Sequence, residues 1–202
     1  MECGIQMLFQ NPGNLSDAEV YAAELKLAKL AEPSGFDSIW CVEHHFTDYT
    51  MCPDVTQFLS YLAGCTSRIK LGTGLLLLPL HDPVRIAEDT AVVDVVSNGR
   101  LVLGLGQGFR PEEFDGFHRD LKDRNKLMRE GVQLLRRFWT EKDVTFEGER
   151  FNYKNLNVTP KPLQKSPPIW IGAKVPSAIK VAADLADVWY ADPITPLHLI
   201  KE

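Results

Sequence analysis

The sequence predicts an α/β fold in which parallel strands alternate with helices, and three observations support this. Six short apolar runs are the predicted strands: 5–9, 38–42, 69–77, 101–105, 169–171 and 188–191. Helical patterns separate most of these runs, and alternation of strands with helices implies parallel pairing. Apolar residues occupy consecutive positions within the runs, as expected when both faces of a strand are covered.

The first helix has a defined beginning and end. Ser16 is followed three residues later by Glu19, the spacing of a capping box, in which each side chain satisfies an amide at the helix N-terminus. Pro33 and Gly35 end the helical pattern. The residues predicted to face the core are Val20, Ala23, Leu27 and Leu30.

Three further helices are predicted from their ends and their apolar stripes. Asp82 and Pro83 open one helix as N-cap and first-turn proline, and Asn98-Gly99 closes it. A longer helix ends near Trp139, and a last helix begins around Pro176. The stripes of these two helices are Leu127, Leu134, Leu135 and Phe138, and then Ala178, Ala182 and Leu185.

The recurrence of strand–helix units is compatible with a TIM (β/α)8-type barrel. A complete barrel has eight units in about 250 residues, whereas this chain of 202 residues has about six. We therefore predict a single barrel domain over residues 1–202 that lacks its C-terminal units. A small hairpin around Glu147-Gly148 is inserted near 144–153. Three explanations stay open: an open sheet, a partner that fills the gap, or a fragment of a longer chain.

Composition disfavours several classes of protein. The net charge is −5 and no stripe of Lys and Arg is present, so nucleic acid is not an expected partner. The N-terminus does not resemble a secretory signal, and the longest apolar run, 75–80, is too short to cross a bilayer. We expect a cytoplasmic protein without membrane contact. The cysteines show no C-x-x-C spacing, which argues against a disulfide frame and a structural metal.

The first candidate site is Glu43-His44-His45-Phe46, directly after the second predicted strand. The carboxyl ends of parallel strands face the ligand crevice, and a histidine there can donate or accept a proton near neutral pH. An ordinary charged surface loop is the alternative. We expect no metal site, because neighbouring strand side chains point to opposite faces, so Glu43, His44 and His45 cannot all converge unless the backbone turns.

Two glycine-containing segments are candidates for contact with a flat ring system. Gly72-Thr73-Gly74-Leu75 lies within the third predicted strand, where glycine often marks a bulge or a backbone approached by a ligand. The segment 104–110 leaves the fourth strand with a G-x-G-x-G spacing instead of the G-x-G-x-x-G of dinucleotide-binding loops. For the first segment, relief of crowding in a packed barrel is the alternative explanation.

A further candidate, Gly172-Ala173-Lys174-Val175-Pro176, joins the fifth predicted strand to the last helix. Exposed amides and the positive end of a helix dipole favour an anion such as phosphate, and Lys174 adds a full charge. Because many helices begin in this way, an ordinary helix start is the alternative.

Taken in this order, the segments resemble the bacterial luciferase-like flavin-dependent monooxygenases, the LLM class of flavin-dependent oxidoreductases. The matching segments are 35–40 with 43–46, 72–79 with 82–89, 97–106, and 168–172. The resemblance extends over essentially the whole chain. It implies a TIM barrel that uses reduced FMN, or in some branches the deazaflavin F420, at the carboxyl ends of its strands.

The resemblance also implies roles for individual residues. His44 would act as an acid or base in oxygenation, Glu43 would shape the site, and a non-prolyl cis peptide would join Gly74 to Leu75. The residues that would contact the substrate are Phe46 and Phe109. The residues that would hold the cofactor are Gly74, Leu75, Gly106, Gln107, Gly172, Ala173, Lys174 and Val175.

One departure concerns the cofactor phosphate. Gln107 stands where the luciferases have an arginine that reaches the phosphate. Binding would then depend more on Lys174 and backbone amides, or on Arg110.

The function that the resemblance implies is a monooxygenase that uses reduced FMN and O2 on a small organic substrate. NAD(P)H would reduce the flavin directly or through a separate flavin reductase, and a homodimer is expected. One alternative is F420-dependent hydride transfer. The other is a truncated flavin-binding or pairing subunit without turnover, because the seventh and eighth strands of the barrel are not found in the sequence.

Overall fold

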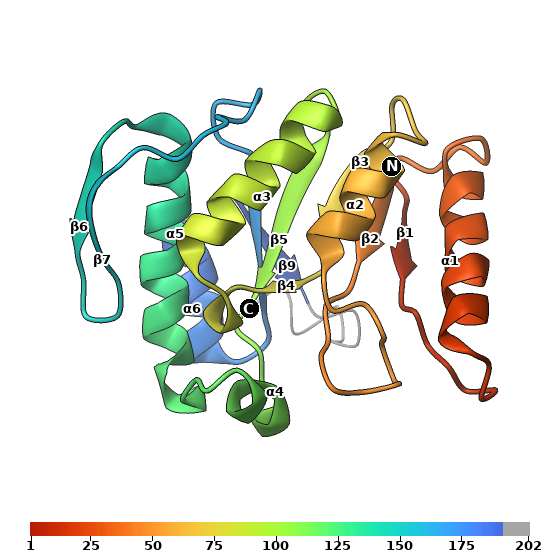
Figure 1. Cartoon of the computed structure of the whole chain (residues 1–202), viewed down its shortest axis with the longest axis horizontal. Helices are drawn as coiled ribbons and strands as arrows, with labels where there is room; N and C mark the ends of the chain where they lie inside the picture. Colours follow the sequence, from red (N-terminus) through yellow and green to blue (C-terminus); the bar gives the residue numbers. More distant parts are fainter. Residues whose placement is uncertain (192–202) are drawn as a thin grey trace.

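The computed structural model describes residues 1–191 and shows a parallel sheet curled into a half-barrel (Figure 1). The strand order is β1-β2-β3-β5-β8-β9, and β4 also pairs with β5. The bounds are β1 Gly4–Met7, β2 Ser38–Cys41, β3 Lys70–Thr73, β4 Leu76–Leu77, β5 Leu101–Gly106, β8 Ile169–Ala173 and β9 Val188–Ala191. The α/β fold class with parallel strands is confirmed.

Helices cover the outer face of the sheet (Figure 1). Their bounds are α1 Asp17–Ala31, α2 Val55–Ala63, α3 Pro83–Val96, α5 Arg124–Thr140 and α6 Pro176–Leu185. The short helix α4 (Pro111–Gly116) follows β5 beyond the carboxyl ends of the strands. Strands β6 (Val144–Glu147) and β7 (Asn152–Leu156) form an antiparallel hairpin beside α5. Within residues 1–191, no helix combines the length and the apolar character needed to span a membrane.

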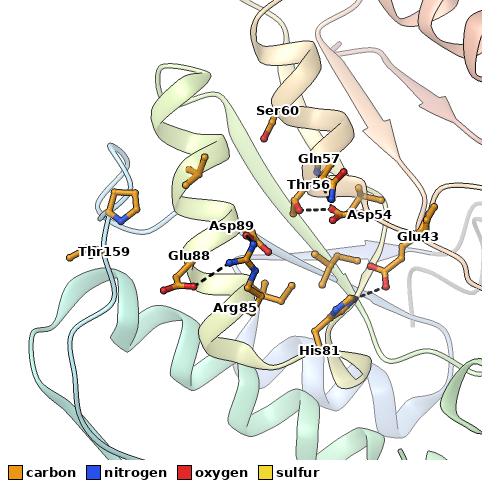
Figure 2. A pocket seen from close by; sticks show the side chains of 16 residues that line it. Glu43, Asp54, Thr56, Gln57, Ser60, His81, Arg85, Glu88, Asp89 and Thr159 are labelled. Atoms are coloured by element: carbon orange, nitrogen blue, oxygen red, sulfur yellow. Dashed lines mark hydrogen bonds and ion pairs between the residues drawn. The ribbon is translucent and has the colours of Figure 1, made fainter. Parts of the chain in front are cut away.

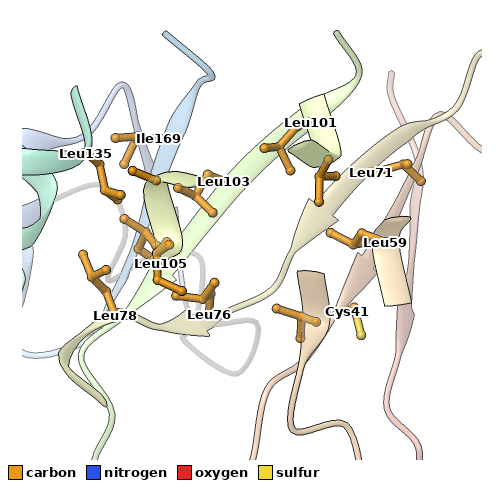
Figure 3. Packing of buried hydrophobic residues seen from close by; sticks show 14 of the residues in the cluster. Cys41, Leu59, Leu71, Leu76, Leu78, Leu101, Leu103, Leu105, Leu135 and Ile169 are labelled. Atoms are coloured by element: carbon orange, nitrogen blue, oxygen red, sulfur yellow. The ribbon is translucent and has the colours of Figure 1, made fainter. Parts of the chain in front are cut away.

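The two faces of the sheet carry different residues, because side chains alternate along each strand. The outward-pointing residues are aliphatic and almost completely buried beneath the helices; they include Leu71, Leu101, Leu103, Leu105 and Ile169 (Figure 3). Removal of each such side chain from water stabilises the fold by roughly 1.5–3 kcal/mol. The inward-pointing positions include glycine and aromatic residues instead, and the strand register pairs Trp40 with Gly72 and Gly104 with Trp170. The glycines of the candidate segments therefore line the concave face.

The capping box of α1 is confirmed, but of the four residues predicted to face the core only Val20 does so. The Ser16 hydroxyl accepts from the Glu19 amide, and the Glu19 carboxylate accepts from the Ser16 amide. The buried residues of α1 are Val20, Ala28 and Ala31, whereas Ala23 is exposed and Leu27 and Leu30 are each 50% exposed.

Close packing and one half-buried acid select the observed face of α1. Small alanine side chains let the helix approach β1 and β2. Glu24 lies on the same face, where its carboxylate accepts a hydrogen bond from the Phe9 amide (3.2 Å). Burial raises the pKa of Glu24, and the amide bonds only partly offset this. A prediction from hydrophobicity assumes that an acid faces solvent, so it assigns a different face of the helix to the core.

The third predicted strand is interrupted, and one helix forms where the sequence analysis specified no element. The strand predicted over 69–77 divides into β3 and β4 at Gly74-Leu75, where the Gly74 amide donates to the Cys41 carbonyl (2.7 Å). Helix α2 lies between β2 and β3, where no helix was specified, and its N-cap Asp54 accepts from the Gln57 amide. Most of α2 is buried, and only Gln57, Ser60 and Tyr61 retain contact with solvent.

Candidate functional site

The carboxyl ends of three strands meet around the side chain of Leu75. The peptide bond between Gly74 and Leu75 is cis, as the resemblance implies. A Cβ atom on Gly106 would lie 3.2 Å from Leu75 Cβ, and one on Gly172 would overlap Leu75 Cδ1. The structure therefore brings Gly74, Leu75, Gly106 and Gly172 into one neighbourhood, and glycine at these positions makes room for Leu75.

Trp40 fills the adjacent part of the concave face. A Cβ atom on Gly72 would overlap its indole ring, and one on Gly74 would lie 3.2 Å from its Cβ. The ring also lies near Trp170, with 5.0 Å between ring centroids. The glycine at position 72 is thus explained by the packing of Trp40, which was the alternative explanation for this segment. The side-chain amide of Gln6 donates to the Gly74 carbonyl (3.0 Å) and holds this end of β3.

His44 is held by a carboxylate that the sequence analysis missed. Its Nδ1 lies 2.7 Å from Oε1 of Glu113, which is 1% exposed and lies in α4. The same oxygen accepts from the His45 amide (3.1 Å). Glu113 Oε2 is buried and has no hydrogen-bond partner among the described residues. When Nδ1 donates to this carboxylate, Nε2 of a neutral His44 is left as a proton acceptor.

Glu43 points away from His44 and belongs to a separate cluster. Its Oε1 lies 2.8 Å from His45 Nε2 and 2.7 Å from His81 Nε2, and its Oε2 accepts from the Leu77 amide (3.0 Å). Burial raises the pKa of the Glu43 carboxyl, but these hydrogen bonds lower it by more, so the net pKa is about 2. Glu43 and His45 are two residues apart and their side chains meet, whereas His44 pairs with Glu113, so the expectation that the three side chains do not all converge holds.

The Glu43 cluster borders a cavity of about 630 Å³ between α2 and α3 (Figure 2). Asp54 lines it from the start of α2, and His81 lies beside it at the start of α3. Arg85 extends from α3 and pairs with Glu88 (3.6 Å) and Asp89 (3.1 Å). Carboxylates thus outnumber cationic side chains in the lining of this cavity.

The remaining predicted site residues lie in different surroundings. Phe46 is 67% exposed and packs on Gly116, and the Phe109 ring is 73% exposed, with its centroid 6.5 Å from that of His44. Lys174 and Val175 are exposed at the start of α6, whereas Ala173 is buried. The Gln107 side-chain nitrogen is buried and has no hydrogen-bond partner among residues 1–191.

Two residues of these clusters escaped the sequence analysis for the same reason. Glu113 is 69 residues from His44, and His81 is 38 residues from Glu43. The one available signal for Glu113 was its place just after the glycine segment 104–110, in the first turn of a helix that begins with Pro111. The signal for His81 was its place next to the predicted N-cap Asp82.

The contact between His81 and Glu43 predicts pH-dependent stability. Burial lowers the pKa of His81, but the Glu43 carboxylate raises it more, so the net pKa lies above the ordinary 6.5. A raised histidine pKa stabilises the folded state below the unfolded-state pKa, and this contribution disappears as the pH rises through the folded-state pKa. Replacement His81→Asn should therefore lower the free energy of unfolding more at about pH 5.5 than at about pH 9. Urea denaturation measures both values, and equal losses would contradict the prediction.

Comparisons with known proteins give consistent results. A family model described as luciferase-like monooxygenase matches residues 1–202. The oxygenase component of a flavin-dependent trigonelline monooxygenase from Acinetobacter baylyi is 29% identical over 202 residues, covering 96% of this chain and 55% of that protein. An F420-dependent glucose-6-phosphate dehydrogenase from Kineococcus radiotolerans is 32% identical over 183 residues, covering 87% of this chain and 51% of that protein.

Solved structures agree with the sequence comparisons. The monooxygenase RslO1 from Streptomyces bottropensis superposes with a TM-score of 0.91 and 32% identity, covering 100% of this chain and 63% of that chain. The chain spans about half the length of the curated relatives it matches.

Proposed function

Because the chain belongs to the luciferase-like monooxygenase family, we propose that it functions as a flavin-dependent monooxygenase that uses reduced FMN and O2 on a small organic substrate. The observation that carries this proposal is the buried side-chain nitrogen of Gln107, which has no partner among the described residues. A buried donor without an acceptor costs about 1–3 kcal/mol, so a bound ligand is expected to supply the acceptor. Gln107 directly follows β5, whose last residue packs beside Leu75.

The residues at this end of the half-barrel fit a phosphorylated flavin. Leu75 and the glycines around it form an apolar surface without protruding side chains, which suits a flat ring system. Lys174 and the first amides of α6 favour a phosphate, and the Gln107 nitrogen adds a donor. We propose that these residues hold FMN.

The cofactor supplies the reaction with oxygen, and the chain supplies binding, orientation and proton transfer. Glu113 fixes the Nδ1 side of His44, so Nε2 is the atom that accepts or returns a proton. The buried Glu113 carboxylate also holds the His45 amide, which limits rotation of the loop that carries His44. We propose that Phe109, beside His44, contacts the substrate.

Binding of FMN tests the proposal through its phosphate. We expect FMN to quench protein fluorescence on titration, and Lys174→Ala to weaken FMN binding by roughly 10–100-fold, since a charged hydrogen bond contributes about 1.5–3 kcal/mol. Riboflavin, which has no phosphate, should bind to parent and variant equally. Lys180→Ala is the matched control, because Lys180 is an exposed lysine on the same helix. Absence of FMN binding, or equal weakening by both substitutions, would overturn the proposal.

F420-dependent hydride transfer is the second candidate function. One relative in the comparisons is named as F420-dependent, and it matches most of this chain. The absorption spectra of FMN and F420 differ, so the spectrum and mass of the purified protein's bound cofactor decide between them. Recovery of bound F420 would overturn the monooxygenase proposal and favour F420-dependent hydride transfer.

The reductant and the assembly are also proposals. One relative is named as an oxygenase component, which supports reduction of FMN by NAD(P)H through a separate reductase. Apolar side chains on α3 are partly exposed and support a homodimer; they are Val92, Val95 and Val96. Flavin reduction by NAD(P)H, measured with and without an added reductase, tests the proposed reductant. Light scattering on the purified protein measures its mass and so tests the homodimer.

A further inference from the structure

We propose that Glu43, His45 and His81 bind a divalent transition-metal ion of the Zn²⁺ type. One ligand atom from each residue lies within 4.8 Å of the other two. Glu43 Oε1 is within 2.8 Å of both imidazole Nε2 atoms. Among residues 1–191, this is the one group of three or more His, Cys, Asp or Glu side chains gathered in this way.

The donor set suits such an ion. Two imidazole nitrogens and one carboxylate oxygen form a common set of three protein ligands for zinc and for other first-row metals. The Leu77 amide holds Oε2 of Glu43, so Oε1 is already directed at the two rings. Contacts that orient a metal ligand before binding raise the affinity of a site. Binding would replace the protons now shared between Glu43 and the two imidazoles and release them to solvent.

The cavity between α2 and α3 gives access to this cluster. Glu43 and His81 both line it, and Figure 2 shows their contact at its edge. Glu43 is 1% exposed, whereas the His81 side chain is 24% exposed, so the ion would enter past His81 and could keep a water ligand on that side. Asp54 and Asp89 also line the cavity and add negative charge that attracts a cation.

The donors of this site differ from the residues proposed to hold FMN. The glycines around Leu75 and the Gln107 nitrogen are not part of it, and two of its donor residues, Glu43 and His81, line the cavity between α2 and α3. Metal binding can therefore be measured without flavin, and its failure would leave the proposed function untouched. Bound metal would tie the segment that follows β2 to the segment that precedes α3.

Titration with Co²⁺ tests the proposal, because the visible absorption of protein-bound Co²⁺ reports its ligands. The protein carries Cys3→Ser and Cys65→Ser, which remove the two exposed thiols, and is first treated with a chelator. We expect one equivalent of Co²⁺ to bind without a thiolate charge-transfer band and to be displaced by Zn²⁺. Loss of a ligand should cost more than loss of an outer contact, so His81→Asn should weaken binding by at least about 100-fold.

His118→Asn is the matched control. His118 is exposed and its φ is 54°, a backbone conformation that asparagine tolerates well, so this variant should bind Co²⁺ like the parent. Circular dichroism checks that His81→Asn is folded, and His81→Gln replaces it if it is not. Absence of stoichiometric Co²⁺ binding by the parent would overturn the proposal. Equal binding by the His81 variant and the parent would also overturn it.

Discussion

Replacement Gly104→Ala should destabilise the protein by about 3 kcal/mol or more, a value at the upper end for overpacking of a core. An added Cβ would overlap the carbonyl oxygen of Thr73 and would lie 3.1 Å from Leu75 Cδ2. The Thr73 oxygen belongs to the backbone of β3, so it cannot move aside as a flexible side chain can. The Thr73 hydroxyl also donates to the Gly104 carbonyl (2.6 Å), and a shift of either strand would disturb this bond. Urea denaturation measures the loss.

Gly13→Ala is the control for this prediction. No atom lies within 4 Å of a Cβ built on Gly13, so the methyl group meets no obstacle. Its effect should stay within about 1 kcal/mol, because the main consequence is a less flexible unfolded chain. Similar stability of the two variants would show that β3 and β5 are not in close contact at Gly104.

Replacement His44→Ala should lower turnover by roughly 10²–10⁴-fold, the usual contribution of a general acid or base. The affinity for FMN should change little, since the residues proposed to hold the phosphate are Lys174 and Gln107. Turnover is measured as product formation from a substrate found by screening small organic compounds for FMN-dependent oxygen uptake. FMN affinity is measured by fluorescence titration.

The contact of His44 with Glu113 gives this prediction a second test. Glu113→Gln keeps the size of the side chain but removes the charge that holds Nδ1 (2.7 Å in the structure). We expect a smaller loss of turnover than for His44→Ala and a shift in its pH profile, which a purely structural role would not produce. Unchanged turnover in His44→Ala would remove His44 from the proposed chemistry. His118→Ala, at an exposed histidine, controls for general effects of removing an imidazole.

The strands and most helices could be predicted because their signals are local. The capping box at Ser16, the proline at the start of α3 and the stripe of α5 each lie within a few residues of one another. Backbone hydrogen bonding and local burial act over the same distances. The predicted elements were wrong where tertiary packing decided which face of a helix is buried or where a strand is interrupted. Helix α1 turned a face with Glu24 toward β1, and Gly74-Leu75 divided the third strand.

By itself, the sequence determined the α/β class, the parallel strand order of a barrel, and the strand ends that carry His44, Gly106 and Gly172. These follow from short-range patterns, since the carboxyl ends of parallel strands necessarily lie on one edge of the sheet. Only the tertiary structure decided which side chains meet there. Glu113 reaches His44, and His81 reaches Glu43, through loops whose paths depend on packing between distant segments. Contacts of this kind depend on the whole fold and leave no local pattern in the sequence.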